Sequence, residues 1–136
     1  MFTRGMFFDG DDSLEISDLV LNTEFTLDFW IRPYVDPENN GHLLHISGGI
    51  DVLFGLFQNA PGIEYLINHY STARLSKEWT HLRYTISKSL LFIYINDVLM
   101  THDNSVFIVE QIIDEATNTH TIGNGYVGFI YKICIT

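Results

Sequence analysis

Apolar and polar residues alternate along several short stretches of the chain, a pattern typical of β-strands that bury one face. The clearest stretch runs from Glu24 to Tyr34, and one side of it carries Phe25, Leu27, Phe29 and Ile31. A proline stands near its end, where a missing backbone donor does least harm to a sheet. We therefore predict one long strand with a buried apolar side.

A second pair of stretches predicts a β-hairpin. Thr80 to Ile86 alternates in the same way, and Leu90 to Ile95 is rich in Phe, Tyr and Ile, which favour strands. The short polar segment 87–89 between them suits a tight turn. Asn96-Asp97 is a further turn signal after the second strand.

Shorter runs predict further strands at Met6 to Phe8, Ser13 to Ile16, His42 to Ser47, Asp51 to Phe57, Ile63 to Tyr70, Thr119 to Ile122 and Tyr126 to Ile135. We expect a turn at Asn59 to Gly62, and we expect the last two strands to form a hairpin-like pair around Gly123-Asn124-Gly125. Within Met100 to Thr117, the segment Val106 to Ile113 fits a strand or a helical turn. No apolar stripe at helical spacing lasts three turns, so the sequence predicts an all-β antiparallel two-sheet sandwich.

The composition and net charge disfavour several classes of function. The 136 residues fit one folded domain, and seven basic against seventeen acidic residues give a net charge of −10. Such a surface repels phosphate backbones and anionic lipid, so nucleic-acid binding and membrane docking are disfavoured. No apolar run approaches the ~20 residues of a membrane-spanning helix, so we expect no membrane insertion.

The end of the chain suggests its context. The sequence stops within a strand-like run, so we expect residues 1–136 to be a single domain and a module of a longer protein. Cys134, the one cysteine, has no partner within the chain, which leaves pairing beyond it open.

The order of these segments resembles the laminin-G-like, concanavalin A-like jelly-roll family. The segments that carry the resemblance are FFDGDDSLEI (Phe7 to Ile16), EFTLDFWIRPY (Glu24 to Tyr34), LLHISGG (Leu43 to Gly49), EWTHLRYTI (Glu78 to Ile86), LFIYINDVLM (Leu91 to Met100), HTIGNG (His120 to Gly125) and GFIYKICI (Gly128 to Ile135). Each is an unspecific pattern alone, but their order is specific and covers nearly the whole chain. Asp97 departs from the family, in which glycine usually follows the asparagine, and this leaves the turn type open.

The resemblance implies two antiparallel sheets packed face to face as a jelly roll, one of them concave. It also implies that the domain binds glycans or proteins, often with a calcium ion at the rim. Members are modules of extracellular proteins, so the resemblance implies an extracellular or cell-surface location for the longer chain.

Some members of this family are glycosidases, which need two carboxylates placed about 5 Å apart when they retain configuration. No predicted strand carries two acids at alternating positions. Glu64 stands alone, and the consecutive Asp114 and Glu115 face opposite ways on a strand. We therefore expect no enzyme, and glucanase-type catalysis is the least favoured function.

Three aspartates crowd one turn. Asp9, Asp11 and Asp12 surround Gly10, and close carboxylates repel each other unless water or a hard cation such as calcium screens them. An ordinary solvated turn and a calcium site are both consistent with this spacing. We take these three residues as the candidate calcium ligands, with calcium as the candidate cofactor.

Histidines are a second possible source of metal ligands. Zinc motifs place their ligands at short spacings on one helix or loop, and His42 and His45 come nearest to this. Because residues three apart on a strand face opposite sides, we interpret the histidines as scattered strand residues. We expect His81 on the solvent side of its strand, beside Trp79.

Aromatic and amide residues near the predicted turns are the candidate ligand contacts. Trp30 and Trp79 suit sugar stacking, but burial within structural strands is the simpler interpretation. Tyrosines near turn ends are better placed, and Tyr126 is one of them. The candidate ligand-binding residues are Tyr65, Tyr70, Asn59, Asn39 and Asn40.

We therefore predict a non-catalytic recognition module that binds a glycan or a protein through rim loops, with calcium as a candidate aid. The loops concerned are Gly10 to Ser13, Pro37 to Gly41, Gly48 to Asp51 and Asn59 to Gly62. The alternative is a structural or assembly domain of a large complex or surface protein that binds no small ligand.

Overall fold

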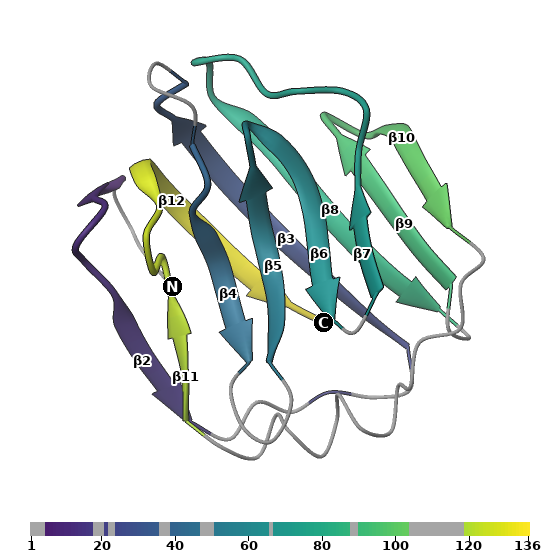
Figure 1. The fold of residues 1–136 in the computed structure, drawn as a ribbon, viewed down its shortest axis with the longest axis horizontal. Helices are drawn as coiled ribbons and strands as arrows, with labels where there is room; N and C mark the ends of the chain where they lie inside the picture. Colours follow the sequence, from purple (N-terminus) through teal and green to yellow (C-terminus); the bar gives the residue numbers. More distant parts are fainter. Residues whose placement is uncertain are drawn as a thin grey trace.

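The computed structural model describes residues 5–17, 21, 24–35, 39–46, 51–65, 67–87, 90–103 and 119–136. Within these residues the strands form two antiparallel sheets of six strands each, stacked face to face (Figure 1). The prediction of an all-β antiparallel jelly-roll sandwich is confirmed. No helix in this part of the chain is long and apolar enough to cross a membrane.

Sheet A has the strand order β1-β12-β3-β8-β9-β10. Its strands are β1 (Met6–Asp9), β12 (Val127–Ile135), β3 (Phe25–Pro33), β8 (Thr80–Ser87), β9 (Leu90–Ile95) and β10 (Val98–Asp103). Sheet B has the order β2-β11-β4-β5-β6-β7 and lies in front in Figure 1, with β2 and β7 at its two edges. Its strands are β2 (Leu14–Ser17), β11 (Thr119–Ile122), β4 (His42–Ile46), β5 (Val52–Phe57), β6 (Ala60–Tyr65) and β7 (Ile67–Tyr70).

The core lies between the sheets and is lined by the inward side of each strand. The alternation of apolar and polar residues along β3 and β8 matches the structure, in which buried and more exposed side chains alternate along both strands. Tyr84 of β8 joins the two layers, because its ring packs against Phe29 of sheet A and Phe54 of sheet B. Its hydroxyl donates to the carbonyl oxygen of Gly55 in sheet B at 2.7 Å, which satisfies a buried polar group.

The predicted hairpin of β8 and β9 is confirmed, with Ser87 opposite Leu90. The next turn joins β9 to β10, and its central residues Asn96 and Asp97 have φ of 50° and 66°. Positive φ at both central residues matches the twist of a two-residue hairpin, and Asn and Asp tolerate it. Asp97 therefore takes the usual place of glycine without altering the hairpin.

Two of the predicted elements were wrong in their bounds. Ile63 to Tyr70 is not one strand, because β6 and β7 pair antiparallel with Tyr65 opposite Ile67. No glycine, proline or asparagine separates them, so the sequence lacked a turn signal there. The turn predicted at Asn59 to Gly62 is shorter, since β6 already begins at Ala60.

The predicted pairing of the last two strands was also wrong. β11 lies in sheet B and β12 in sheet A, so these neighbours in sequence do not pair. The chain crosses between the sheets through Gly123 and Gly125, which both have positive φ, and Tyr126 is fully buried at this crossing. In the stretch left open, β10 extends to Asp103, while Val106 to Ile113 lies outside the described residues.

Candidate functional site

A row of rings crosses the outer face of sheet B, the face turned away from the core. His45 and His42 lie on β4, Phe57 ends β5 and Tyr70 ends β7. The ring centroids are 5.9 Å apart between the two histidines, 6.2 Å between His42 and Phe57, and 5.0 Å between Phe57 and Tyr70. Three strands thus contribute rings to one continuous outward row, and the last pair of rings spans β6.

A glycine explains how the last two rings lie across β6. Gly62 of β6 is the register partner of Tyr70. A Cβ at this position would meet Cδ1 of Tyr70 and the carbonyl oxygen of His69, each at 2.6 Å, and Cδ2 of Phe57 at 3.1 Å. Any side chain here would displace the rings, so Gly62 is required for their close approach to the sheet.

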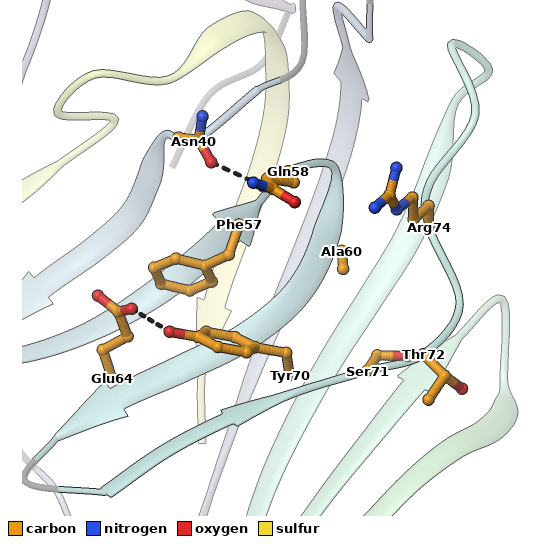
Figure 2. Close-up of a pocket in the computed structure, with 9 residues that line it drawn as sticks. All are labelled: Asn40, Phe57, Gln58, Ala60, Glu64, Tyr70, Ser71, Thr72 and Arg74. Carbon is orange, nitrogen blue, oxygen red and sulfur yellow. Dashed lines mark hydrogen bonds between the residues drawn. The ribbon is translucent and has the colours of Figure 1, made fainter.

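Glu64 fixes the orientation of Tyr70. The tyrosine hydroxyl donates a short hydrogen bond to Oε2 of Glu64 on the neighbouring strand (Figure 2). Burial of the hydroxyl and, next, its bond to the Glu64 carboxylate raise the pKa of Tyr70 to about 12. The phenol therefore stays protonated at neutral pH. Because the side chain is also 44% exposed, it forms a positioned ring that a ligand can reach.

A pocket of about 580 Å³ opens beside these rings (Figure 2). Its lining combines rings with amide, hydroxyl, carboxylate and guanidinium groups from Asn40, Phe57, Gln58, Ala60, Glu64, Tyr70, Ser71, Thr72 and Arg74. The volume is that of a small-molecule site, and the polar groups include both donors and acceptors of hydrogen bonds. The pocket can therefore hold a ligand that has an apolar face and a rim of hydroxyl groups.

Two buried asparagines support the loops that border this pocket. Asn39 and Asn59 are only 3% and 6% exposed. The side-chain amide of Asn39 donates to the carbonyl oxygen of Tyr34 at 3.0 Å, and that of Asn59 donates to the carbonyl oxygen of Val35 at 3.2 Å. Both side chains are engaged inside the protein, so their role is to position the loops rather than to touch a ligand.

The predicted site residues are thus distributed over several roles. The structure brings Asn40 and Tyr70 together at the pocket, whereas Asn39 and Asn59 are buried and are not among the residues that line it. Tyr65 closes β6, and its side chain falls outside the described residues. Two of the four predicted rim loops are described only in part. In the loop Pro37 to Gly41, Asn39 hydrogen-bonds Asn59 in the turn before β6. In the loop Gly48 to Asp51, residues 48–50 lie outside the described residues.

Sequence reasoning missed Phe57, Glu64 and Arg74 as pocket residues. Phe57 was predicted only as the last residue of a strand, and in the structure it is partly buried and stands one position beyond the inward Leu56. The signal was the strand's period of two: because Val52, Phe54 and Leu56 point inward, the next residue, Phe57, points outward. The signal for Glu64 was a single acid between apolar neighbours in a strand. Nothing in the sequence pattern placed Arg74 beside them.

The prediction that the histidines are scattered was wrong for one pair. The register of β4 against β5 shifts between His42 and Leu44, and this bulge brings the rings of His42 and His45 into contact although they are three residues apart. Burial and then the neighbouring His45 lower the pKa of His42, so its imidazole is neutral at neutral pH. Nε2 of His45 lies 3.1 Å from Oδ1 of Asp51.

The tryptophans expected in the core lie instead on the outer face of sheet A, 40% exposed at Trp30 and 43% at Trp79. His81 is on the outer side as predicted, but it stacks on Trp30 rather than lying beside Trp79, with centroids 5.1 Å apart. Asp28 holds its ring through a 2.7 Å contact to Nε2.

The three aspartates proposed as calcium ligands form a turn that is stabilised by its own backbone. Oδ1 of Asp9 accepts from the backbone nitrogen of Asp11 at 2.9 Å, and Oδ2 of Asp12 accepts from that of Asp9 at 3.0 Å. The first of these bonds, followed by the contact with Asp12, lowers the pKa of Asp9. Within the described residues, no three acidic, histidine or cysteine side chains converge on one point. The geometry fits a solvated turn better than a cation site, and calcium binding stays a prediction.

The pocket also bears on hydrolysis. Glu64 is the one carboxylate among the described residues that line it. Glycosidases of this fold class act with two carboxylates, one as acid and one as base or nucleophile. The pocket lining therefore supplies half of that arrangement.

The chain matches the family model of the concanavalin A-like lectin/glucanases superfamily over residues 8–131. Its fold is similar to domain 4 of an extracellular arabinanase from Geobacillus stearothermophilus, solved in complex with arabinotriose, with 16% identity, a TM-score of 0.72, and coverage of 96% of this chain and 69% of that chain. It is also similar to domains LG4-5 of the mouse laminin alpha1 chain, with 11% identity, a TM-score of 0.70, and coverage of 98% and 40%.

A carbohydrate-binding module from Bacillus subtilis is a third similar structure, with 10% identity, a TM-score of 0.52, and coverage of 99% of this chain and 93% of that chain. Comparison with curated protein sequences gives no match. Because the family match spans most of the chain and the two six-stranded sheets agree with it, the chain belongs to the concanavalin A-like lectin/glucanases superfamily.

Proposed function

We propose that the chain is a non-catalytic carbohydrate-binding module and that the outer face of β4–β7 is its binding surface. The observation that carries the proposal is the positioned ring pair of Phe57 and Tyr70 at the mouth of a polar pocket. A sugar ring has an apolar C–H face that packs on aromatic rings and a rim of hydroxyls that need hydrogen-bond partners. The pocket offers both kinds of contact within one small volume.

Each polar group has a distinct part in this proposal. Glu64 accepts hydrogen bonds from sugar hydroxyls while it holds Tyr70, since a carboxylate has about four acceptor sites. Arg74 supplies a donor from the loop after β7. Asn40, whose Oδ1 accepts from the backbone nitrogen of Gln58 at 2.7 Å, keeps its amide donors for a ligand.

Two further features support binding without catalysis. The pocket carries a single carboxylate among its described residues, where hydrolysis needs a pair. Among the similar structures, one is a carbohydrate-binding module and another is a domain of an arabinanase in complex with arabinotriose. The latter enzyme is extracellular, which supports our proposal that this chain acts outside the cell as a module of a longer protein.

The proposal is tested on a glycan array, followed by calorimetry with each bound sugar and with arabinotriose as a defined probe. Tyr70→Ala should weaken sugar binding by about tenfold or more, because it removes half of the ring pair. Tyr70→Phe keeps the ring and should weaken binding less. The matched control is Tyr131→Ala, which removes a similarly exposed tyrosine (42%) on the opposite face and should leave sugar binding unchanged.

An array on which no glycan is bound, with or without calcium, would overturn the proposal. Sugar binding that is lost in Tyr131→Ala and kept in Tyr70→Ala would move the site to sheet A. Circular dichroism and the thermal midpoint of each variant separate loss of binding from loss of the fold.

A further inference from the structure

A second group of exposed rings lies on the outer face of sheet A, away from the proposed sugar site. We call it the aromatic patch, and it consists of Phe7, Tyr34, Trp79, Phe129 and Tyr131. Neighbouring ring centroids are 5.2 to 6.3 Å apart, so the five rings form one connected surface. Tyr34 is 47% exposed, and Phe7, Trp79 and Tyr131 are exposed to a similar extent. Connected aromatic rings in water mark an interaction surface.

A groove of about 390 Å³ adjoins this patch, and we call it the basic groove. Apolar side chains form much of its lining, at Pro33, Tyr34, Val35 and Phe129. Its charged residues are Arg32 and Lys77, and Nε of Arg32 donates to the backbone carbonyl oxygen of Lys77 at 3.2 Å. This bond holds the guanidinium at the groove, so a fixed cation stands beside an apolar cleft.

The charges on this side contrast with those of the whole chain. The chain has seven basic residues and a net charge of −10. Four of the seven basic residues lie on the outer side of sheet A. Arg32 and Lys77 line the basic groove, and Arg83 and Lys132 line a second pocket, where Arg83 is paired with Asp28. Acids on this side include Asp28, Glu78 beside Lys77, and Asp97, whose Oδ1 lies 3.7 Å from Nη2 of Arg83. The basic groove itself has no acid among the described residues that line it.

The donors of this groove select a ligand different from a sugar. Arg and Lys side chains only donate hydrogen bonds, whereas sugar hydroxyls are best held by donors and acceptors together. Two cations beside an apolar cleft match carboxylates that are carried next to apolar side chains. The small number of cations and the net charge of −10 disfavour a nucleic acid.

We propose that the aromatic patch and the basic groove together form a docking surface for an acidic, apolar segment of a partner protein. An apolar side chain of that segment packs on Trp79 and Phe129, and its carboxylates pair with Arg32 and Lys77. Aromatic residues and arginine are the residues that most often dominate the energy of an interface. We name a foreign partner rather than a second copy, because the two cations attract a local group of carboxylates, whereas two whole chains that each carry a net charge of −10 repel each other.

The experiment uses two short synthetic peptides in which phenylalanines are spaced by glycine and either glutamate or lysine. Binding is followed by fluorescence anisotropy of the labelled peptide and by the NMR signal of the Trp79 indole. The glutamate peptide should bind, shift the Trp79 signal and weaken with added salt, whereas the lysine peptide should not bind.

Charge reversal gives the decisive comparison. The double variant Arg32→Glu, Lys77→Glu should lose about tenfold or more in affinity for the glutamate peptide and gain affinity for the lysine peptide. The matched control Arg74→Glu reverses one exposed cation at the sugar pocket and should keep the preference for the glutamate peptide. Thermal unfolding of each variant verifies that the fold is retained.

Three outcomes would overturn the proposal. The first is no binding of the glutamate peptide at millimolar concentration, and the second is equal affinity of the wild type and the double variant for it. The third is concentration-dependent dimerisation in sedimentation that is lost in Trp79→Ser, which would assign the surface to a second copy. Tyr70→Ala should leave peptide binding intact, so this result is independent of the sugar site.

Discussion

Asn39 and Asn59 hydrogen-bond each other twice. The backbone nitrogen of Asn39 donates to Oδ1 of Asn59 at 2.8 Å, and the backbone nitrogen of Asn59 donates to the carbonyl oxygen of Asn39 at 3.0 Å. The pair joins the segment before β4 to the turn before β6, two segments that lie apart in sequence. Asn40 and Gln58, their immediate neighbours, are brought to the edge of the pocket as a result.

Removing one side chain of this pair should destabilise the fold. Asn59 has φ of 65°, so Asn59→Gly keeps the backbone conformation and removes only the amide. We expect a loss of about 1–3 kcal/mol in the free energy of unfolding, since buried partners are left without hydrogen bonds. Urea unfolding measures it, and Asn40→Ala, at an exposed neighbour, should cost about 0.5 kcal/mol or less. Equal costs for the two variants would contradict the positioning role.

Gly62→Ala should impair the sugar site through sterics. The added methyl would lie 2.6 Å from Cδ1 of Tyr70 and 2.6 Å from a backbone oxygen, so the ring of Tyr70 and its strand must shift. We expect sugar affinity to fall at least as far as in Tyr70→Ala. Calorimetry measures it, and the double variant Gly62→Ala, Tyr70→Ala should bind no worse than Gly62→Ala alone. A further loss in the double variant would mean that Tyr70 still contributes after the glycine is replaced.

The bond from Tyr84 to Gly55 should be visible in stability. Tyr84→Phe retains the ring between Phe29 and Phe54 but leaves the carbonyl oxygen of Gly55 without its donor. We expect a loss of about 1–3 kcal/mol, measured by urea unfolding. A neutral substitution would show that this oxygen is satisfied by other groups.

Alkaline pH should weaken the fold through buried tyrosines. Burial raises the pKa of Tyr84 and of Tyr126 far above the ordinary value of 10.0, so each must stay protonated in the folded protein. Their contribution is complete below pH 10 and is lost as the pH rises above it, by up to about 1.4 kcal/mol per pH unit for each tyrosine. Unfolding free energies measured from pH 8 to 11 should fall less steeply in Tyr84→Phe. Parallel curves for the variant and the wild type would contradict this assignment.

Acid should weaken the fold through His42. Burial lowers the pKa of its imidazole below the ordinary value of 6.5, so the folded state favours the neutral ring. The stability that this ring provides is present above pH 6.5 and is lost as the pH falls through its lowered pKa. His42→Gln should therefore lose less stability than the wild type between pH 7 and pH 5, as measured by chemical unfolding.

Thermal unfolding with calcium and with a chelator tests whether calcium binds to the native protein. Calcium binding at the turn of Asp9 to Asp12 stays a prediction, and an ion held there should raise the thermal midpoint in millimolar calcium relative to chelator. An increase of several degrees that disappears in Asp9→Asn would establish a site at this turn. The same measurement on Asp51→Asn controls for calcium bound elsewhere.

The fold could be predicted because burial repeats with period two, as in β3 and β8, and because turn residues mark most strand ends. Strand order was harder to predict. β11 and β12 are close in sequence and lie in different sheets, and the reversal between Tyr65 and Ile67 has no turn residue. Such choices depend on packing across the core, which local sequence patterns do not encode.

The site was predictable only in part for a related reason. Tyr70 and Asn40 stand near turns and could be identified, whereas the contact of Phe57 with Tyr70 depends on the register of three strands. A slip of one residue would turn every side chain to the other face. The bulge in β4 that brings His42 and His45 together cannot be located from alternation, because it interrupts alternation.

The mutual hydrogen bonds of Asn39 and Asn59 have a kinetic consequence. These hydrogen bonds fix the positions of the groups around the pocket when the chain folds, so the proposed sugar ligand would meet a preorganised surface and order few protein groups as it binds. With no slow rearrangement to wait for, encounter should proceed at similar rates for related sugars. Selectivity among related sugars would then arise from different dissociation rates, which depend on how many of the preformed hydrogen bonds and ring contacts each sugar makes.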